Sequence, residues 1–447
     1  MSHYKPYPAY RDSGVEWLAR VPKHWKVGNI RRFAQMKTGH TPSRSEPSYW
    51  QSCDIPWFTL ADVWQLRNER QKFLGDTNEQ ISLLGLENSA AELLPAGTVV
   101  FSRTASIGFS GVMPVPMATS QDFWNWIPCP ELLSEYLLYT FRSMRQEFAR
   151  LTMGSTHKTI YQPDAAGLQI CVPPIEEQRK VVECLDRETA RIDALIEKKT
   201  RFIELLREKR QALITHAVTK GLDPNVKMKD SGLEWLGEVP EHWDVAPMKY
   251  VCELLKDGTH LPPPRTDEGV PLLSVRNIID GHFTLRDDDS TISHQDYMEL
   301  CKAFIPQEGD VLLAVVGATL GKTALIPAAL GQFHIQRSLA IFRPHHGRMN
   351  SRWLHLIFQS SLFQSLLWEH AGYSAQPGIY LGTLAGFSIP QPPLNEQAQI
   401  SSYLSERTAR LDSLIRTTES SIELLKERRS ALITAAVTGQ IDLREAV

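Results

Sequence analysis

The sequence predicts an α+β protein made of two similar halves, each a mixed α/β domain followed by one long helix. Two repeats carry this prediction: the stretch at 173–223 recurs at 392–442, and an aromatic segment at 12–27 recurs at 230–245. The longer repeat keeps a constant offset of 219 residues (392 − 173), and 25 of its 51 aligned positions are identical. Sequence repeated over such a length indicates that the fold contains two copies of one unit.

Each long repeat carries a row of residues at seven-residue spacing, mostly apolar, which is typical of a helix that packs along another helix. The row consists of Leu185, Ile192, Lys199, Leu206 and Leu213 in the first copy, and of Leu404, Leu411, Thr418, Leu425 and Leu432 in the second. Neither helix can bury this row alone, so we expect the two to pack on each other. The polar members, Lys199 and Thr418, either fix the register or mark a locally hydrated seam.

The ends of both long segments carry helix-terminus signals. Each begins with a Pro-Pro pair and an acidic first turn, and each ends near a glycine, Gly221 or Gly439. A helix from 176 to 218 would span roughly 60–65 Å at about 1.5 Å per residue.

The aromatic repeats are expected to be packing anchors. Trp17 and Trp25 recur as Trp235 and Trp243, each pair around a proline turn. Because the neighbouring His24 and His242 recur with them, we interpret both histidines as packing residues and not as ligands.

Between anchor and helix, each half holds a segment of short strands and loops rich in glycine, proline and threonine. The two segments diverge, but 94–108 resembles 305–321, and Gln121 matches Gln336. The stretches 135–150 and 352–370 have helical periodicity. The predicted domains are therefore 1–172, the helix 173–221, 222–391, and the helix and tail 392–447.

Composition limits the class of protein. At 447 residues the chain is too long for one ordinary core. It has no apolar run of the roughly 20 residues that cross a bilayer, and its polar N-terminus does not resemble a signal peptide. Its six cysteines lack metal-type spacing and indicate reduced thiols in a cytoplasmic protein. The net charge of −3 argues against DNA binding by bulk electrostatics alone.

No credible catalytic motif emerges. The run at 317–323, GATLGKT, has three residues where a nucleotide-binding phosphate loop needs four, so we interpret it as a tight turn between strands. Pro163-Asp164 together with 197–199 formally matches a PD…ExK nuclease pattern, but 197–199 lies on the long helix and is replaced in the second copy. We interpret it as a solvated helix face, and the pair His345-His346 as surface residues.

The α/β segments do carry side chains suited to reading DNA. Arginine and glutamine form bidentate hydrogen bonds with guanine and adenine edges, and Lys, Thr, Ser and Tyr reach phosphates. These segments have no basic excess, with 11 Lys+Arg against 12 Asp+Glu at 28–150 and 11 against 13 at 246–391. The candidate DNA-binding residues are Arg103, Thr104, Ser106, Gln121, His157, Lys158, Tyr161, Arg276, Thr319, Lys322, Gln336, Arg337, Gln376 and Tyr380.

These motifs together resemble the specificity (S) subunit of Type I restriction-modification systems. The resemblance is carried by the DSGxEWLxxVPxHW anchors, the PPxxEQ helix starts and the ELLxExRxALITxAVT helix ends, each present twice. It covers nearly the whole chain and is specific for anchors and helices, but loose for the α/β segments.

The resemblance implies that each α/β segment is a target recognition domain that reads one half of a bipartite DNA site. It implies that the two helices form an antiparallel coiled coil with pseudo-twofold repetition, which sets the unread spacer. It further implies that the chain is not catalytic and binds no cofactor. Two modification subunits would use S-adenosylmethionine to methylate adenine N6, and restriction subunits would use ATP and Mg²⁺ and cleave DNA.

Two other functions remain open from the residues. The chain could be a fragment of a self-contained DNA methyltransferase-nuclease, in which case it would bind S-adenosylmethionine itself. It could also be a coiled-coil scaffold with two protein-binding domains, in which case it would not retain DNA when its partner subunits are present.

Overall fold

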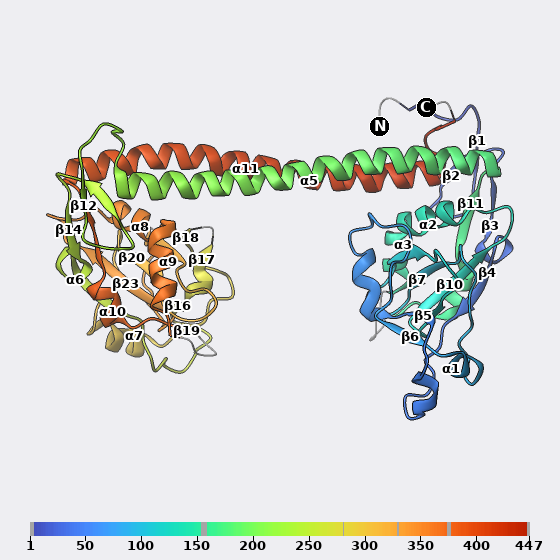
Figure 1. Ribbon diagram of the computed structural model, residues 1–447, viewed down its shortest axis with the longest axis horizontal. Helices are drawn as coiled ribbons and strands as arrows, with labels where there is room; N and C mark the ends of the chain where they lie inside the picture. Colours follow the sequence, from blue (N-terminus) through green and yellow to red (C-terminus); the bar gives the residue numbers. More distant parts are fainter. Residues whose placement is uncertain (1–3, 153–158, 280, 329, 373–376, 445–447) are drawn as a thin grey trace. The chain divides into compact units, whose positions relative to one another are not determined.

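The computed structural model describes residues 4–152, 159–279, 281–328, 330–372 and 377–444. It divides into two compact units, the first formed by residues 1–200 and 419–447 and the second by 201–418. Each unit contains a mixed α/β domain and one half of each long helix (Figure 1). The predicted fold class is therefore confirmed, whereas the domain boundaries at 172, 221 and 391 stay a prediction.

The two long helices are α5, Ile175–Lys220, and α11, Leu394–Val437, as the repeats predicted. Gly221 and Gly439 follow them with φ of 77° and 71°, the left-handed conformation expected just after a helix. In unit 1, Asp193 of α5 pairs with Arg429 of α11, and in unit 2 Arg210 pairs with Asp412. Numbers rise on one helix as they fall on the other, so the helices are antiparallel.

The seven-residue rows face the helix–helix contact or the α/β domains. Leu185, Ile192, Leu206, Leu404, Thr418 and Leu432 are buried, and Lys199, Leu213, Leu411 and Leu425 are partly buried. The Thr418 hydroxyl donates to the carbonyl of Leu414 at 2.7 Å, so this polar seam residue is satisfied within its own helix. In each unit, burial of these apolar residues stabilises the packing of α5 and α11.

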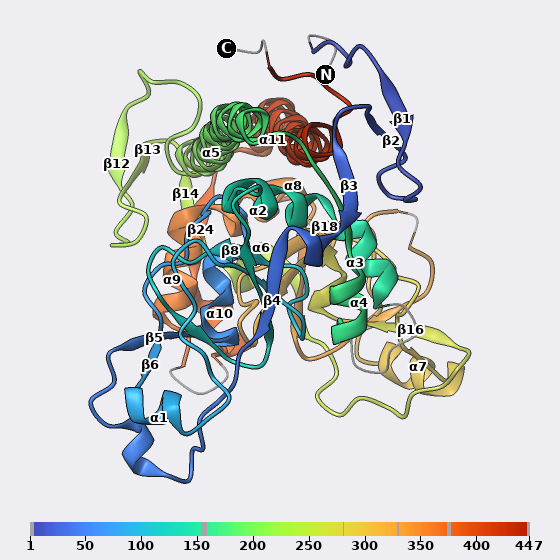
Figure 2. The same ribbon diagram turned by 90° about the vertical axis from the view of Figure 1, so that its right-hand side faces the viewer.

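In the part of unit 1 that the structure describes, the strands form four sheets. Figure 2 shows this unit from the side on which it faces the viewer. The central sheet has the order β4-β10-β7-β8, and a smaller sheet has the order β6-β5-β9 with β5 and β9 parallel. The strands are β1 Tyr10–Asp12, β2 Arg20–Pro22, β3 Lys26–Asn29, β4 Ala34–Thr38, β5 Ile55–Phe58, β6 Glu79–Ile81, β7 Val99–Ser102, β8 Ser110–Val112, β9 Ala118–Thr119, β10 Phe123–Pro128 and β11 Gln169–Val172. The short helices are η1 Ile30–Arg32, η2 Pro47–Trp50, η3 Leu60–Leu66, α1 Leu83–Glu87, α2 Ser134–Ser143, α3 Arg145–Leu151 and α4 Gln162–Gly167.

Unit 2 repeats this plan with a larger central sheet of order β15-β23-β20-β21-β18-β17 and a smaller one of order β19-β16-β22. The strands are β12 Met228–Asp230, β13 Glu238–Pro240, β14 Asp244–Pro247, β15 Cys252–Asp257, β16 Val270–Leu273, β17 Ile278–Ile279, β18 His282–Phe283, β19 Thr291–Ile292, β20 Val311–Ala314, β21 Thr323–Leu325, β22 His334–Ile335, β23 Leu339–Pro344 and β24 Ser388–Gln391. The short helices are α6 Met248–Val251, η4 Val275–Asn277, α7 His294–Cys301, α8 Ser351–Gln359, α9 Ser361–Glu369 and α10 Leu381–Gly386.

The stretches with helical periodicity each form two helices instead of one. The breaks fall at Met144, between α2 and α3, and at Ser360, between α8 and α9. The Ser360 hydroxyl accepts from the amide of Phe363 and so caps the second helix. In each unit the first of the two helices, α2 or α8, packs on the central sheet.

The aromatic anchor of unit 1 is held by one buried carboxylate at the start of α5. Glu177 accepts from Trp25 Nε1 at 3.0 Å, contacts His24 Nε2 at 2.9 Å, and accepts from the hydroxyl of Tyr7. Burial, together with this hydrogen bond, raises the pKa of Tyr7. The first-turn acidic residue of the PPxxEQ motif therefore fixes the anchor to the helix.

Unit 2 repeats this contact at the start of α11. Glu396 accepts from Trp243 Nε1 at 3.1 Å and contacts His242 Nε2 at 2.7 Å. The side chains of His24 and His242 are 43% and 48% exposed, and each contacts the carboxylate that accepts from the neighbouring tryptophan. Their interpretation as packing residues therefore stays a prediction.

The glutamine of the PPxxEQ motif joins each helix to its α/β domain. Gln178 Nε2 donates to the carbonyls of Glu131 and Pro173 at 2.7 and 2.8 Å, and its Oε1 accepts from the amide of Leu133. In unit 2, Gln397 makes the same set of bonds, to Arg348, Pro392 and Asn350. Both glutamines are fully buried, so each satisfies backbone groups that would otherwise be buried without partners.

Among the residues that the structure describes, no helix is both long and apolar enough to cross a membrane.

Candidate nucleic-acid interface

Three loops meet at one edge of the α/β domain in unit 1, at residues 103–106, 120–122 and 159–161. We call them the first loop cluster. The amide of Arg103 donates to the carbonyl of Asp122, and the amide of Ile160 donates to the carbonyl of Arg103, both at 2.9 Å. Thr104 and Thr159 form an isolated bridge. The backbone of Arg103, directly after β7, is thus hydrogen-bonded to both of the other loops.

Unit 2 has the same arrangement at residues 315–321, 336–338 and 378–380, the second loop cluster. The amide of Val315 donates to the carbonyl of Ser338, and the amide of Ile379 donates to the carbonyl of Val315, both at 3.0 Å. Val316 and Gly378 form the matching bridge. The same backbone frame therefore occurs in both units.

A glycine lets a fourth segment approach each cluster closely. A Cβ at Gly39 would lie 2.2 Å from the carbonyl oxygens of Thr119 and Ser120, and one at Gly258 would lie 2.2 Å from the carbonyl oxygen of Gln336. No side chain fits at these distances, so both positions require glycine.

These backbone contacts correct one match made from the sequence. Ser120 donates its amide to Phe58, and Gln336 donates its amide to Leu273, at 3.0 and 2.9 Å. Phe58 and Leu273 are equivalent, because each ends the strand that pairs in parallel with β9 or β22. Gln336 is therefore equivalent to Ser120, and Gln121 to Arg337. The match of Gln121 with Gln336 was wrong by one residue.

In the first loop cluster the structure brings together five of the candidate residues. Thr104 donates its hydroxyl to Asp122 Oδ1 at 2.8 Å, and the carbonyl of Ser106 accepts from the hydroxyl of Ser102. The exposed Gln121 accepts from the Thr41 hydroxyl at 2.6 Å. Arg103 is half-buried over the ring of Trp124, and Tyr161 is exposed at the start of α4. The candidates His157 and Lys158 lie outside the described residues.

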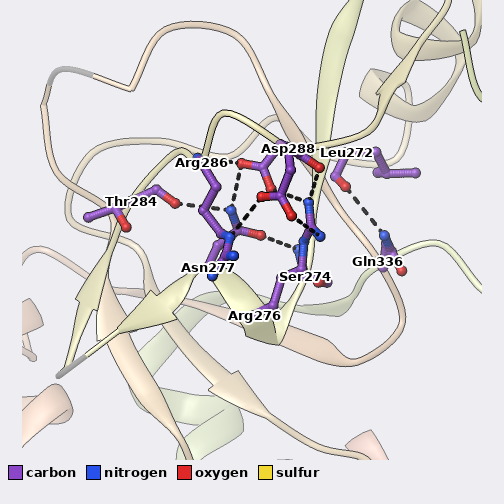
Figure 3. Close-up of polar contacts among 9 residues, drawn as sticks. Leu272, Ser274, Arg276, Asn277, Thr284, Arg286, Asp288 and Gln336 are labelled. Carbon is purple, nitrogen blue, oxygen red and sulfur yellow. Dashed lines mark hydrogen bonds and ion pairs between the residues drawn. The ribbon is translucent and has the colours of Figure 1, made fainter. Parts of the chain in front are cut away.

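In the second loop cluster, Arg337 and Tyr380 are exposed, with Tyr380 85% exposed. Gln336 instead turns its amide to the carbonyl of Leu272 at 3.3 Å (Figure 3), which indicates a structural role. The carbonyl of Thr319 accepts from the amide of Lys322 at 3.1 Å in the turn between β20 and β21. The GATLGKT run is thus a strand-to-strand turn, as interpreted from the sequence. Gln376 lies outside the described residues.

Arg276 lies in an acidic cluster after β16 (Figure 3). Its Nη1 is 3.2 Å from Asp288 Oδ2, its Nη2 is 2.9 Å from Asp289 Oδ1, and Nη2 also donates to the carbonyl of Asp288. The outer edge of the guanidinium is therefore occupied, and the contacts tie the loop at 286–289 to η4. Arg276 remains a DNA-binding prediction, but the geometry favours a structural role.

The residues of the formal nuclease pattern lie on separate helices. Asp164 is in α4, whereas Glu197 and Lys199 are in α5. Within the described part of the chain, no three histidine, cysteine, aspartate or glutamate side chains are grouped so that they could hold a metal ion.

Sequence reasoning missed Trp124 and Asp122, which support Arg103 and Thr104 from the neighbouring strand. Neither is recognisable from a motif, since each contact crosses about twenty residues of chain. The pairing of β7 with β10, which brings Phe101 opposite Trp124, creates both contacts.

Comparisons with known proteins agree with this architecture. The family model for the Type I restriction modification DNA specificity domain matches residues 22–205 and again 240–424. The MjaIX specificity subunit of Methanocaldococcus jannaschii is 30% identical over 191 residues, which span 42% of each chain. The MjaVIII specificity subunit of the same organism is 22% identical over 95% of each chain.

Two solved structures share the fold. A chain from a structure titled as the basis of complex assembly and conformational transition of the type I R-M system aligns with a TM-score of 0.72 and 18% identity, over 94% of this chain and 99% of that one. The HsdS subunit from Thermoanaerobacter tengcongensis aligns with a TM-score of 0.52 and 18% identity, over 94% of this chain and 98% of that one. The two family matches cover more than half of the sequence, and the chain belongs to the family of Type I restriction-modification specificity subunits.

Proposed function

We propose that this chain reads a bipartite DNA site, with each loop cluster contacting one half-site and the coiled coil setting the spacer. The observation that carries the proposal is the recurrence of one backbone frame with different side chains. The first loop cluster presents Arg103 and Gln121 where the second presents Val315 and Arg337. Two loop clusters with the same backbone arrangement but different side chains would bind DNA in the same way and recognise different base sequences.

Catalysis in this family lies in other subunits. We infer that this chain holds two modification subunits, which bind S-adenosylmethionine and methylate adenine N6, and through them restriction subunits that use ATP and Mg²⁺. The complex would act in the cytoplasm, where the chromosome and incoming DNA are found.

Mild acidity of the chain is compatible with this role if the partner subunits supply most of the positive charge. The formal net charge is −3, so phosphate contacts would come largely from the assembled complex. A complex that neutralises several phosphates releases counterions, and its affinity then falls steeply with salt. An affinity of the complex insensitive to salt would contradict this proposal.

The decisive experiment is methylome sequencing of cells that carry this chain with its modification subunits. We expect one methylated motif made of two specified half-sites around an unspecified spacer. A chain without DNA-reading function would leave the methylome unchanged when it is deleted. Labelled S-adenosylmethionine should bind the modification subunits and not this chain alone, which separates this role from that of a methyltransferase fragment.

A further inference from the structure

Arg103, in the first loop cluster, is held in a fixed orientation by an aromatic ring. Its guanidinium carbon lies 4.5 Å from the centroid of the Trp124 ring. That ring is only 4% exposed, and its Nε1 donates to the carbonyl of Ile160 at 3.0 Å. The backbone of Arg103 is also hydrogen-bonded on both sides, to Asp122 and Ile160. The backbone bonds and the Trp124 ring together hold the Arg103 side chain in one orientation.

The guanidinium of Arg103 has no hydrogen-bond or ion-pair partner among the described residues, and its Nε is buried without an acceptor. Its side chain forms no ion pair with the carboxylate of Asp122, whose oxygens have other donors. Asp122 Oδ1 accepts from Thr104 at 2.8 Å and Oδ2 accepts from Ser120 at 2.9 Å. The buried Nε lies out of reach of a ligand, whereas Nη1 and Nη2 are not among the buried unpaired atoms, so these two terminal nitrogens are the donors open to a base.

A planar cation fixed over a ring is suited to bidentate recognition. Stacking uses the face of the guanidinium and leaves its N–H edges available in the plane. Guanine offers the matching pair of acceptors, N7 and O6, in the major groove. A side chain held in one orientation before binding also loses less conformational entropy when it binds.

We propose that Arg103 reads a guanine in the half-site of unit 1. This proposal rests on the function proposed above. The equivalent position in unit 2 is Val315, which is 5% exposed and has no donor on its side chain. The half-site of unit 2 therefore receives no base contact from this position, and the guanine contact is specific to one half of the motif.

The test uses the complete complex of this chain with its modification subunits. Methylomes are compared for the unmodified chain, Arg103→Met and Arg103→Lys. Methionine keeps apolar packing over Trp124 but removes the donors, whereas lysine keeps the charge but not the bidentate geometry. Arg337→Met makes the same substitution at a different position of the frame, in the second loop cluster, and should leave the half-site of unit 1 unchanged.

We expect Arg103→Met to relax one G·C position in the half-site of unit 1 and to leave the other half-site unchanged. Arg103→Lys should retain only part of the discrimination. Binding to duplexes that carry 7-deazaguanine, which lacks the N7 acceptor, at that position should be about tenfold to a hundredfold weaker for the unmodified complex. The Arg103→Met complex should bind both duplexes equally.

Three outcomes overturn the proposal: no G·C pair in the half-site of unit 1, an unchanged motif in Arg103→Met, or continued sensitivity of that variant to 7-deazaguanine. If Arg103 had only a structural role, Arg103→Met would weaken binding to both duplexes by the same factor. Absence of any bipartite motif with the unmodified chain would instead reject the proposed function itself. The melting temperature of each variant shows whether folding has been altered, and Arg103→Lys decides the matter if Arg103→Met does not fold.

Discussion

Arg429 of α11 lies against Asp193 of α5, with Nε 3.2 Å from Oδ1. In unit 2 the equivalent residues exchange helices, and Arg210 Nε of α5 lies 2.9 Å from Asp412 Oδ1 of α11. Both pairs follow the repeat offset of 219 residues (412 − 193 and 429 − 210). The same ion pair therefore fixes the helix register in each unit, although its surroundings differ.

The Arg429 pair is the more buried, and we expect its loss to be the more destabilising. The side chain of Arg429 is 10% exposed, against 29% for Arg210. Arg429 also contacts Glu69 Oε2 at 3.5 Å and donates to the Glu69 carbonyl at 2.8 Å. Arg429→Met should destabilise unit 1 by about 3 kcal/mol, since it leaves Asp193 without its partner on α11.

Arg210→Met is the matched control and should cost less than about 1 kcal/mol, as expected for a more exposed pair. Calorimetric melting of both variants measures the difference. Equal losses in the two variants would show that burial does not set the strength of this pair.

Glu177 is expected to be essential for the anchor of unit 1. Trp25 is 1% exposed, and its Nε1 donates to the Glu177 carboxylate. Glu177→Ala leaves this indole N–H buried without an acceptor, and should cost about 2–3 kcal/mol. Glu176→Ala, at the exposed neighbouring position, should change stability by less than about 0.5 kcal/mol. Thermal melting distinguishes the two, and similar values would contradict the role assigned to Glu177.

Unit 2 should lose stability in mild acid because of a partly buried histidine in α8, His355. Burial, helped by the nearby charges of Arg210 and His282, lowers the pKa of His355 to about 4. The unfolded chain, with a histidine pKa near 6.5, binds this proton more readily than the folded one. Stability should therefore be complete above about pH 6.5 and fall as the pH drops toward 4, by roughly 2–3 kcal/mol.

His355→Gln should flatten this dependence, since glutamine does not titrate. Stability measured at pH 7 and pH 5 for both proteins provides the comparison. Burial also lowers the pKa of His334, which adds to the acid sensitivity in the same direction. A variant that keeps the full slope would exclude His355 as its cause.

The sequence predicted the helices well because their apolar rows repeat locally along the chain. It did not reveal why the glutamate and glutamine of the PPxxEQ motif recur, because the partners of Glu177 lie 152 to 170 residues away. Local periodicity survives in a single sequence, whereas a long-range hydrogen bond leaves no pattern in it.

The loop clusters were only partly predictable. Arg103, Gln121 and Arg337 were chosen as candidates from their chemistry and remain predictions, but Gln336 was matched to the wrong residue. The match of Gln121 with Gln336 implies an offset of 215 (336 − 121), whereas the strand pairing of β9 and β22 gives 216 (335 − 119). Strand register is set by backbone hydrogen bonds, which side-chain resemblance does not report.

The corrected register predicts that Gln121 and Arg337 act on different half-sites. Both are exposed at the same position of the repeated frame. Gln121→Ala and Arg337→Ala should each relax one half of the methylated motif, at about 1–3 kcal/mol per lost contact. The other half of the motif serves as the internal control in each methylome. Loss at both halves in either variant would show that these residues do not lie on the reading surface.

The spacer should depend on the length of the helices and not on the loop clusters. The division between the units falls after Thr200 in α5 and after Thr418 in α11, so insertions there leave the contacts within each unit intact. Four residues inserted near Lys199 should lengthen the spacer, but one helix would then lose its register with the other.

Seven residues inserted at both places keep the seven-residue seam and lengthen each helix by about 10 Å. At about 3.4 Å per base pair, the spacer should gain about three base pairs with both half-sites unchanged, as methylome sequencing would show. An unchanged spacer would mean that the coiled coil does not set the distance between the two half-sites.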